Sequence, residues 1–386
     1  MDRKKVDKRK RIVLNKWLIV LLIVIISALL RAEVATARGP VNNNIDYDGI
    51  QDVIDDILSH ETEFDFNEYV ERLVSGQESF SLSDIGEKLI KSIKSEIKGN
   101  INIFGKLIAI AVLAAIFTNF SMAFKNNQVS ETGYYVTHLL LQGLLMSSFV
   151  SASQVASRAI GSLLDFMKVL VPAYFISVGF CSGSTTSLVY YEASLFLITA
   201  ADYILIKVII PLINFYLVIA LINNISKEDM LSKLAGVIST IVDWGLKSLL
   251  AAVIGFNGIQ GLIVPVADRI KKSALLKASE AIPGVGNAIG GVAETMLGAG
   301  YLLKNAIGVA GLVMIITICA IPIIKLVVVN LIYRFGCAAL QPISDKRVIE
   351  CVSASAKSSG LLLQTVFTGA VLFMLTITIV AVSTGG

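Results

Sequence analysis

Residues 302–335 read LLKNAIGVAGLVMIITICAIPIIKLVVVNLIYRF, and this stretch decides the fold class. It is apolar along almost its whole length and contains a single break at Ile321-Pro322. About 20 mainly apolar residues in a helix cross the hydrocarbon of a bilayer, which demands that every backbone polar group be paired within the protein. The stretch therefore predicts membrane-embedded helix.

Similar apolar tracts recur along most of the chain. They cover 101–123, 134–156, 169–181, 188–205, 208–224, 246–265, 302–320, 321–335 and 361–382. The composition agrees, because 55% of the residues are hydrophobic and 16% are charged, whereas soluble domains carry about a quarter charged residues. We predict an all-α, polytopic helical membrane protein with about eight spans, in a range of about six to nine.

Two pairs of tracts run into each other at a proline. Residues 188–224 contain Pro211 and residues 302–335 contain Pro322, so each predicts either a tight hairpin or one long bent helix. We count both as hairpins and treat 169–181 and 280–298 as segments that do not cross. Most basic residues between the later tracts then face the cytoplasm, as membrane proteins prefer.

The amino terminus has the order of a secretory signal peptide. Residues 1–16 carry eight basic side chains, and residues 17–30 are apolar but too short to span a bilayer. Ala35 and Ala37 then form a small-x-small cleavage site. We expect residues 1–37 to be removed, and an uncleaved anchor is the alternative. The basic run leads into an apolar stretch, so it indicates signal orientation and not nucleic-acid binding.

Residues 38–98 predict a small, acidic, helical region outside the cytoplasm. They carry fourteen Asp or Glu against six Lys or Arg. Apolar residues such as Ile50 and Ile54 recur at helical spacing, and a second helix is expected to begin near Asp65. So small a region builds a thin core, so it packs on the membrane domain, residues 99–386, or binds a partner.

Matched prolines favour an internal duplication. Two pairs share a spacing of 111 residues: Pro172 with Pro283, and Pro211 with Pro322. The repeats would cover about 165–265 and about 276–382. Each has a Pro- or Gly-containing segment, a tract broken at Ile-Pro, a charged helix and a final span. With the hairpins counted, the two repeats are inverted, a plan found in transporters.

Two groups of residues are candidates for a functional site. Ionisable residues in apolar tracts are costly and invite a functional role. They are Lys106, His138, Glu192, Asp202, Lys207, Lys304 and Lys325, and the candidates for conduction among them are Glu192, Asp202, Lys207 and Lys325. Glu192 and Lys325 are the better candidates for an interior pair, whereas Asp202 and Lys207 also fit a hairpin turn. Candidates for helix breaks or close packing are Pro172, Pro211, Pro283, Gly284, Gly286, Gly290, Gly291 and Pro322.

No enzyme signature emerges from the sequence. The chain has two histidines, no HExxH pattern and no Walker motif, and its four cysteines form no CxxC pair. We therefore predict no catalytic residues, no cofactor and no metal site.

Two stretches carry a resemblance to a known family. They are AIPGVG at 281–286, continuing through Glu294, Leu297 and Gly298, and LQPISDKR at 340–347. With these stretches, the order of signal peptide, acidic region and polytopic domain over nearly all of residues 10–386 resembles the stage III sporulation protein AE family of endospore-forming bacteria.

The resemblance implies a non-enzymatic membrane component of the secretion-like channel complex that joins mother cell and forespore and is required for forespore development. The protein would sit in the mother-cell-derived outer forespore membrane with its amino-terminal region extracytoplasmic. Its partners would be ring components, a forespore-side protein, a secretion-type ATPase and membrane lipid, with no nucleic acid. The alternative is a permease-like transporter that conducts small molecules on its own. A scaffold and a conduit both stay open at this point.

Overall fold

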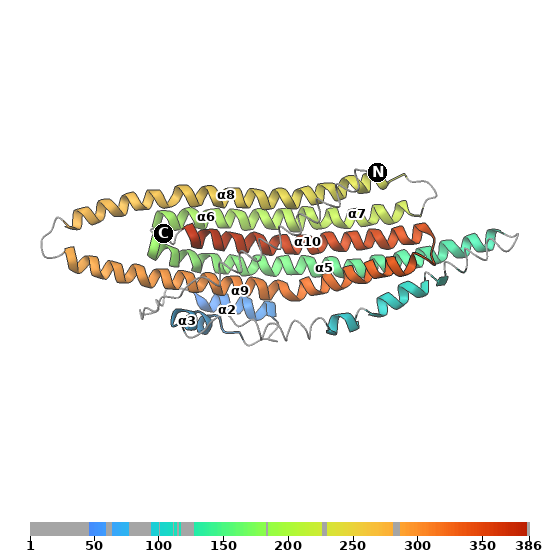
Figure 1. The fold of residues 1–386 in the computed structure, drawn as a ribbon, viewed down its shortest axis with the longest axis horizontal. Coiled ribbons are helices and arrows are strands. Elements are labelled where there is room, and N and C mark those ends of the chain that lie inside the picture. Colours follow the sequence, from blue (N-terminus) through green and yellow to red (C-terminus); the bar gives the residue numbers. More distant parts are fainter. Residues whose placement is uncertain are drawn as a thin grey trace.

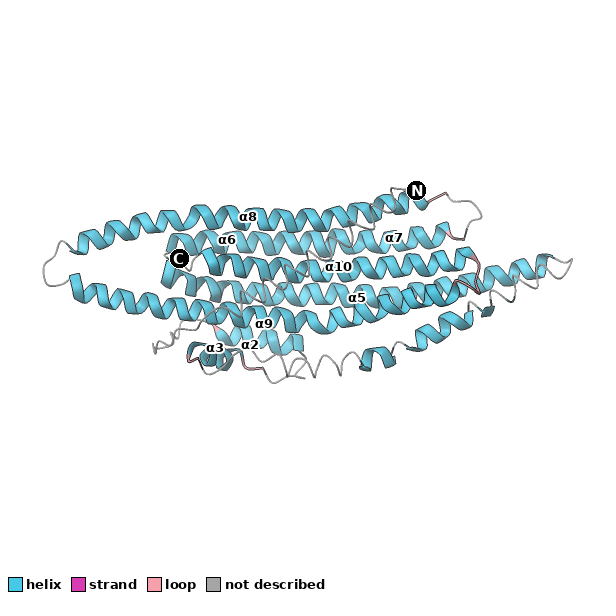
Figure 2. Cartoon of the chain, viewed as in Figure 1, coloured by secondary structure: helices cyan, strands magenta, loops and turns pink. Residues whose placement is uncertain are grey.

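The computed structural model describes residues 46–58, 64–76, 94–99, 101–110, 112–113, 116, 127–182, 184–225, 230–280 and 286–383. All regular secondary structure in these ranges is helical (Figure 2), which confirms the predicted all-α class. The expected signal peptide, with Ala35 and Ala37, lies outside the described residues.

Long helices lie side by side in an elongated bundle (Figure 1). Their bounds are Asn127–Ser182 for α5, Ser184–Ala201 for α6, Asp202–Ile209 for the π-helical segment η1, Ile210–Asn223 for α7, Ser232–Glu280 for α8, Gly286–Leu340 for α9 and Lys346–Ser383 for α10. In the part of the chain that the structure describes, five helices are long and apolar enough to cross a membrane. The chain is therefore a multi-pass membrane protein.

Each proline-broken tract forms one continuous helix and not a hairpin. Pro211 lies in the first turn of α7, and η1 directly precedes it. A π-helical turn takes up an extra residue, so the helix absorbs a proline that has no N–H to donate. Pro322 lies inside α9, and Pro172 lies inside α5. The segment 169–181 likewise continues α5, and residues 286–298 of the segment 280–298 begin α9. In the described residues, fewer and longer helices therefore take the place of the hairpins.

The order of the helices puts α10 at the centre of the bundle. It packs against α9, α5, α8 and α7, and most of its residues after Cys351 are buried. Figure 1 shows that α6–α7 and α9 run in the same direction, opposite to α5, α8 and α10. The helices with the matched Pro211 and Pro322 are thus parallel, as in a direct repeat. The duplication itself stays a prediction.

Two short amphipathic helices pack on the flank of this bundle. Helix α2 (Tyr47–Leu58) lies against α5, and α3 (Phe66–Val74) lies against α9. Their apolar sides join the core through Ile50 and Ile54 of α2 and through buried residues of α3. The first two helices expected in the acidic region are therefore present, and this part of it packs on the membrane domain. A third, expected from Asp84 onward, lies mostly outside the described residues.

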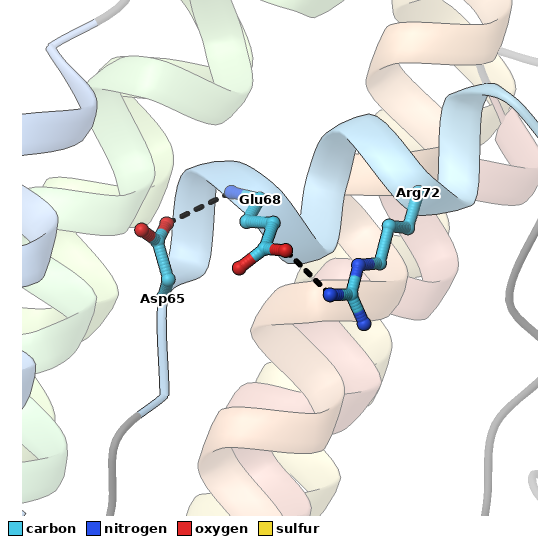
Figure 3. Close-up of polar contacts among 3 residues, drawn as sticks. All are labelled: Asp65, Glu68 and Arg72. Carbon is cyan, nitrogen blue, oxygen red and sulfur yellow. Dashed lines mark hydrogen bonds and ion pairs between the residues drawn. The ribbon is translucent and has the colours of Figure 1, made fainter.

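Local polar contacts fix where α3 begins and how it meets α2. The Asp65 carboxylate accepts a hydrogen bond from the backbone N–H of Glu68 at 2.8 Å, which caps the helix, and Glu68 pairs with Arg72 (Figure 3). Gln51 of α2 bonds two backbone groups next to α3. Its Nε2 donates to the Phe64 carbonyl at 2.8 Å, and its Oε1 accepts from the Phe66 N–H at 2.9 Å.

Candidate functional site

Polar side chains on and around α10 form the most unusual feature of the bundle interior. Burying a polar group away from water is unfavourable unless the group is hydrogen-bonded. The buried polar side chains of α10 itself are Ser355, Ser358, Ser359, Thr365, Thr368 and Thr376. Side chains on the surrounding helices bond to α10 at several levels, which we describe from the end where α10 begins, the Lys346 end, to the end where it finishes, the Ser383 end.

The first cluster ties α5, α7 and α10 together near the Lys346 end. Gln142 Nε2 donates to the Leu221 carbonyl in the last turn of α7 at 2.9 Å. The same amide lies 3.2 Å from His138 Nε2 and 3.9 Å from the sulfur of Cys351. One glutamine on α5 therefore holds the carboxyl end of α7 and the first turns of α10.

A thiol and an imidazole also meet in this cluster. The Cys351 sulfur lies 3.8 Å from His138 Nε2, and these are the residue types of a thiol nucleophile and its base. Both side chains are buried, with exposed fractions of 0% and 2%. The cluster is suited to holding helices together.

Farther along, Asn330 joins α9 to α10. Its Nδ2 donates to the Ala356 carbonyl at 2.6 Å and to the Ser359 hydroxyl at 2.9 Å. The amide reaches the backbone of α10 because Gly360 has no side chain. A Cβ at Gly360 would lie 3.2 Å from the Asn330 nitrogen. This glycine therefore allows the two helices to approach closely.

At a similar level, Lys357 joins α10 to α8 and α7. Its ammonium donates to the Ser239 hydroxyl of α8 at 2.7 Å and lies 5.0 Å from the centre of the Tyr216 ring of α7. A hydroxyl acceptor and an aromatic face both stabilise a cation that has lost water. Lys357 is therefore part of the helix packing.

Lys304 binds the last turn of α10 at the Ser383 end. Its side chain is fully buried, its Nζ donates to the Ala381 carbonyl at 3.2 Å, and it lies 5.1 Å from the Tyr301 ring centre. The last carbonyls of a helix have no partner within the helix, and their dipoles attract a cation. A buried lysine from α9 thus closes the end of the central helix.

The predicted polar residues do not gather into a site. Glu192 is exposed on α6 and Lys325 is half-buried on α9, and no ion pair between these two described residues is present. Asp202 and Lys207 lie in η1, in the middle of a continuous helix and not in a hairpin turn. The expected interior pair is therefore not formed.

Of the predicted packing residues, Pro172, Pro211 and Pro322 lie within the long helices. Gly286, Gly290 and Gly291 lie in the first turns of α9, and Pro283 and Gly284 lie outside the described residues.

The closest glycine contact was missed by the sequence argument. A Cβ at Gly311 would lie 2.6 Å from Leu170 Cδ2 of α5, and a Cβ at Gly308 would lie 3.3 Å from Tyr174 Cε2. Small residues at this spacing within the tract 302–320 were the available signal.

Packing between α5, α6 and α10 leaves a small apolar space. A cavity of about 10 Å³ lies between α5, α6 and α10 and has an apolar lining that includes Met167 and Ile377. That space suits no more than one water molecule. In the part of the chain covered by the structure, no group of three His, Cys, Asp or Glu side chains could hold a metal ion. The arrangement can hold helices in fixed register.

Comparison with known proteins agrees with the sequence resemblance. The family model described as Stage III sporulation protein AE (spore_III_AE) matches residues 64–384. Stage III sporulation protein AE of Bacillus subtilis (strain 168) is 25% identical over 308 residues, which cover 80% of this chain and 77% of that protein. No solved structure matches the chain. Since the matched residues include α3 and every long helix of the bundle, the chain belongs to the stage III sporulation protein AE family.

Proposed function

We propose that this protein is a non-enzymatic membrane component of the secretion-like channel complex that links mother cell and forespore during endospore formation. It lies in the mother-cell-derived outer forespore membrane, and its acidic region faces the space between the two membranes. Membership of a sporulation-stage family implies association with other sporulation proteins. The proposed partners are ring components, a forespore-side protein and a secretion-type ATPase.

The observation that carries this proposal is the use of the interior polar groups. Gln142, Asn330, Lys304 and Lys357 each hydrogen-bond a neighbouring helix, and α10 takes part in most of these contacts. A conduit needs polar groups directed at a continuous water-filled space. The contacts around α10 instead fix helices against each other, which supports a rigid scaffold and anchor.

The surface of α2 and α3 supports a role in recruiting partners. Residues 46–58 and 64–76 contain eight Asp or Glu and one Arg. While the apolar side of α2 is buried on the bundle, Asp48, Asp52 and Asp56 are exposed along its other side. Such a surface attracts a positively charged partner and steers its approach.

The test removes these charges without touching the buried side of α2. We expect a D48N/D52N/D56N variant to accumulate in the membrane at the normal level while it co-purifies less of the other sporulation-complex proteins and supports fewer mature spores. An E192Q variant, which neutralises an exposed carboxylate on α6, is the matched control and should behave as wild type. Normal co-purification with the triple variant would contradict recruitment through this surface.

A second test separates the scaffold from a permease. If Glu192 and Lys325 carry no solute, sporulation of cells with the combined E192Q and K325M changes should equal that of wild type. A block in sporulation, with the variant still assembled with its partners, would instead support conduction through this domain.

A further inference from the structure

The bundle is much longer than a bilayer is thick. α5 contains 56 residues and α9 contains 55, which at about 1.5 Å per residue correspond to roughly 80 Å. The hydrocarbon core of a bilayer is about 30 Å thick. Even where the helices tilt, lipid can surround only part of the bundle, and the remainder projects into water or into a partner.

Three cations on three different helices mark a level near the middle of the bundle. Arg158 of α5, Lys207 of η1 and Lys247 of α8 are all exposed. None of the three has an ion-pair partner among the residues that the structure describes. We call these three residues the cation belt.

Contacts between α5 and α7 show that Arg158 and Lys207 lie at the same height. The Ser153 hydroxyl bonds the Asn214 side chain at 2.9 Å, which aligns the two helices at that point. Arg158 follows Ser153 by five residues, and Lys207 precedes Asn214 by seven. Because the two helices are antiparallel, both steps lead in the same direction along the bundle. At about 1.5 Å per residue the two heights differ by roughly 3 Å.

A contact between α8 and η1 places Lys247 at this height too. A Cβ on Gly245 would lie 3.0 Å from Ile209 Cδ1, so these two positions face each other. Lys247 follows Gly245 by two residues, and Lys207 precedes Ile209 by two. Because these helices are also antiparallel, both steps go in the same direction along the bundle.

A bilayer centred on this level would place three outward-facing cations in hydrocarbon. Each lysine or arginine at the middle of a membrane helix costs about 2.5–3.5 kcal/mol on insertion scales. The same side chains are favourable at the headgroup level, where they meet lipid phosphates. The belt therefore coincides with a bilayer surface and not with its centre.

The distance along the bundle from the cation belt to the Lys346 end matches the hydrocarbon thickness of one bilayer. Lys357 bonds Ser239 at 2.7 Å, which aligns α10 with α8. On α8, Lys247 is eight residues beyond Ser239 toward the Ser383 end. On α10, Lys346 is eleven residues before Lys357, in the opposite direction. The sum, about 19 residues, corresponds to roughly 28 Å of helix, close to the thickness of the hydrocarbon.

The surface of this half is suited to lipid. No Asp, Glu, Lys or Arg occurs in residues 132–157 of α5 or in residues 208–225 of α7 and its end. Large apolar side chains point outward here, including Leu139 at 56%, Phe215 at 64% and Trp244 at 69% exposed.

Several charged residues of this half have positions compatible with lipid. Lys357 bonds Ser239. Lys233 is the second residue of α8, and Arg334 lies within two turns of the end of α9. From these positions, long cationic side chains reach the headgroups of the opposite membrane surface. Asp243 is one turn from Lys247 and therefore lies close to the belt.

The other half of the bundle has a water-facing flank. Figure 1 shows α2 and α3 on the flank of the bundle, nearer to the end at which α10 finishes. The exposed carboxylates of α2 and α3 cannot face hydrocarbon. Asp165 and Lys168, also beyond the belt, form an exposed ion pair at 2.8 Å.

We propose that the bilayer surrounds only the half of the bundle between the Lys346 end and the cation belt, and that Arg158, Lys207 and Lys247 bind the phosphate groups of phospholipids at one membrane surface. The half that carries α2 and α3 projects from that surface. This inference depends on the helix alignment alone and holds whether the protein is a scaffold or a conduit.

The first test measures which half lies in lipid. Phe196 and Phe215 are on one continuous helix, on opposite sides of Lys207, and are 65% and 64% exposed. F196C and F215C are made in a chain whose four native cysteines are replaced by alanine, and open membrane fragments are treated with a membrane-impermeant maleimide. We expect F196C to react at least tenfold faster than F215C, and both to react fully after denaturation. Equal rates, or the reverse order, would overturn the proposal.

The second test measures lipid binding at the belt. The full chain is placed in nanodiscs containing phosphatidylglycerol, released into the mass spectrometer, and its bound lipids are counted. An R158Q/K207Q/K247Q variant should retain fewer than half of the lipids that wild type retains. K168Q, which removes a cation ten residues beyond Arg158, and the charge-preserving R158K/K207R/K247R variant should both retain the wild-type number. Equal retention by the glutamine variant would exclude headgroup binding by these three residues.

Discussion

The hydrogen bonds within the pair of acidic helices, α2 and α3, join residues that are closer in sequence than most of those that hold the central helix α10. Bonds within the α2–α3 pair join residues three to fifteen positions apart, as between Asp65 and Glu68 or between Gln51 and Phe66. Most of the bonds that hold α10 join residues 26 or more positions apart, up to 213 between His138 and Cys351. The pair can therefore form its own contacts, whereas α10 finds its partners only when the bundle is assembled. Changes at α10 should accordingly affect the whole protein, and changes at α2–α3 should act locally.

The largest effect is expected where α9 meets α5 and α10. A leucine at Gly311 would begin with a Cβ only 2.6 Å from Leu170 Cδ2 and 3.5 Å from Ile377 Cδ1. Overpacking of a filled core costs about 1–3 kcal/mol and more when backbone must move. We expect G311L to lose most of the monodisperse protein on gel filtration in detergent and to lower the midpoint of thermal unfolding. G143L is the control, since a Cβ at Gly143 meets no atom within 4 Å. Similar behaviour of the two variants would contradict the close packing.

A smaller effect is expected at Asn330. Alanine there removes the hydrogen bonds to the Ala356 carbonyl and the Ser359 hydroxyl. Interhelical hydrogen bonds in membrane proteins contribute about 0.6 kcal/mol on average and up to about 2 kcal/mol. N330A should therefore lose about 1 kcal/mol in an SDS unfolding titration, and N305A, at an exposed asparagine of the same helix, should lose little. A double-mutant cycle with S359A measures the coupling free energy between Asn330 and the Ser359 hydroxyl. A coupling near zero would show that this hydrogen bond does not stabilise the bundle.

The start of α3 was predictable because it depends on residues close in sequence. The path of the chain at Pro211 was not predictable because it depends on helices far away in sequence. A helix near Asp65 was expected from local spacing, and α3 begins at Phe66 with Asp65 as its cap. The conformation at Pro211 depends on how the neighbouring helices pack around the chain. In the bundle the chain continues as one helix, with a π-helical turn directly before the proline. The sequence around that proline allowed both a hairpin and a bent helix.

Buried polar residues were the hardest part of the site to predict. Glu192 and Lys325 stand out in apolar tracts as strongly as Lys304 does, yet only Lys304 is fully buried against a helix end. Helical periodicity gives the relative direction of side chains on one helix, but the partner of Lys304 is 77 residues away. The identity of that partner follows from how the helices pack.

At the α2–α3 pair, loss of one side chain should loosen the pair and leave the bundle intact. Q51A leaves the Phe64 carbonyl and the Phe66 N–H without the amide that bonds both. Hydrogen bonds of this kind contribute about 1 kcal/mol each. We expect limited proteolysis to cleave between α2 and α3 several-fold faster in Q51A, with no change in the thermal unfolding of the bundle. N67A, at an exposed residue of α3, serves as the control. A shift in bundle unfolding with Q51A would show that the two regions are not independent.

The smallest effect is a pH dependence confined to this pair. Burial, with a smaller contribution from the Glu71 carboxylate, raises the pKa of Tyr47 to about 12. The docked state then keeps a phenol proton that an undocked tyrosine, with a pKa near 10, gives up. Its contribution to docking is complete below about pH 10 and is lost as the pH rises through 12. Proteolysis of the pair by an alkaline protease should accelerate more between pH 9 and pH 11 in wild type than in Y47F, which has no proton to lose. Other groups titrate in both proteins, so the difference between the two slopes of proteolysis rate against pH isolates the contribution of Tyr47. Equal slopes would mean that its hydroxyl is already solvated when the pair is docked.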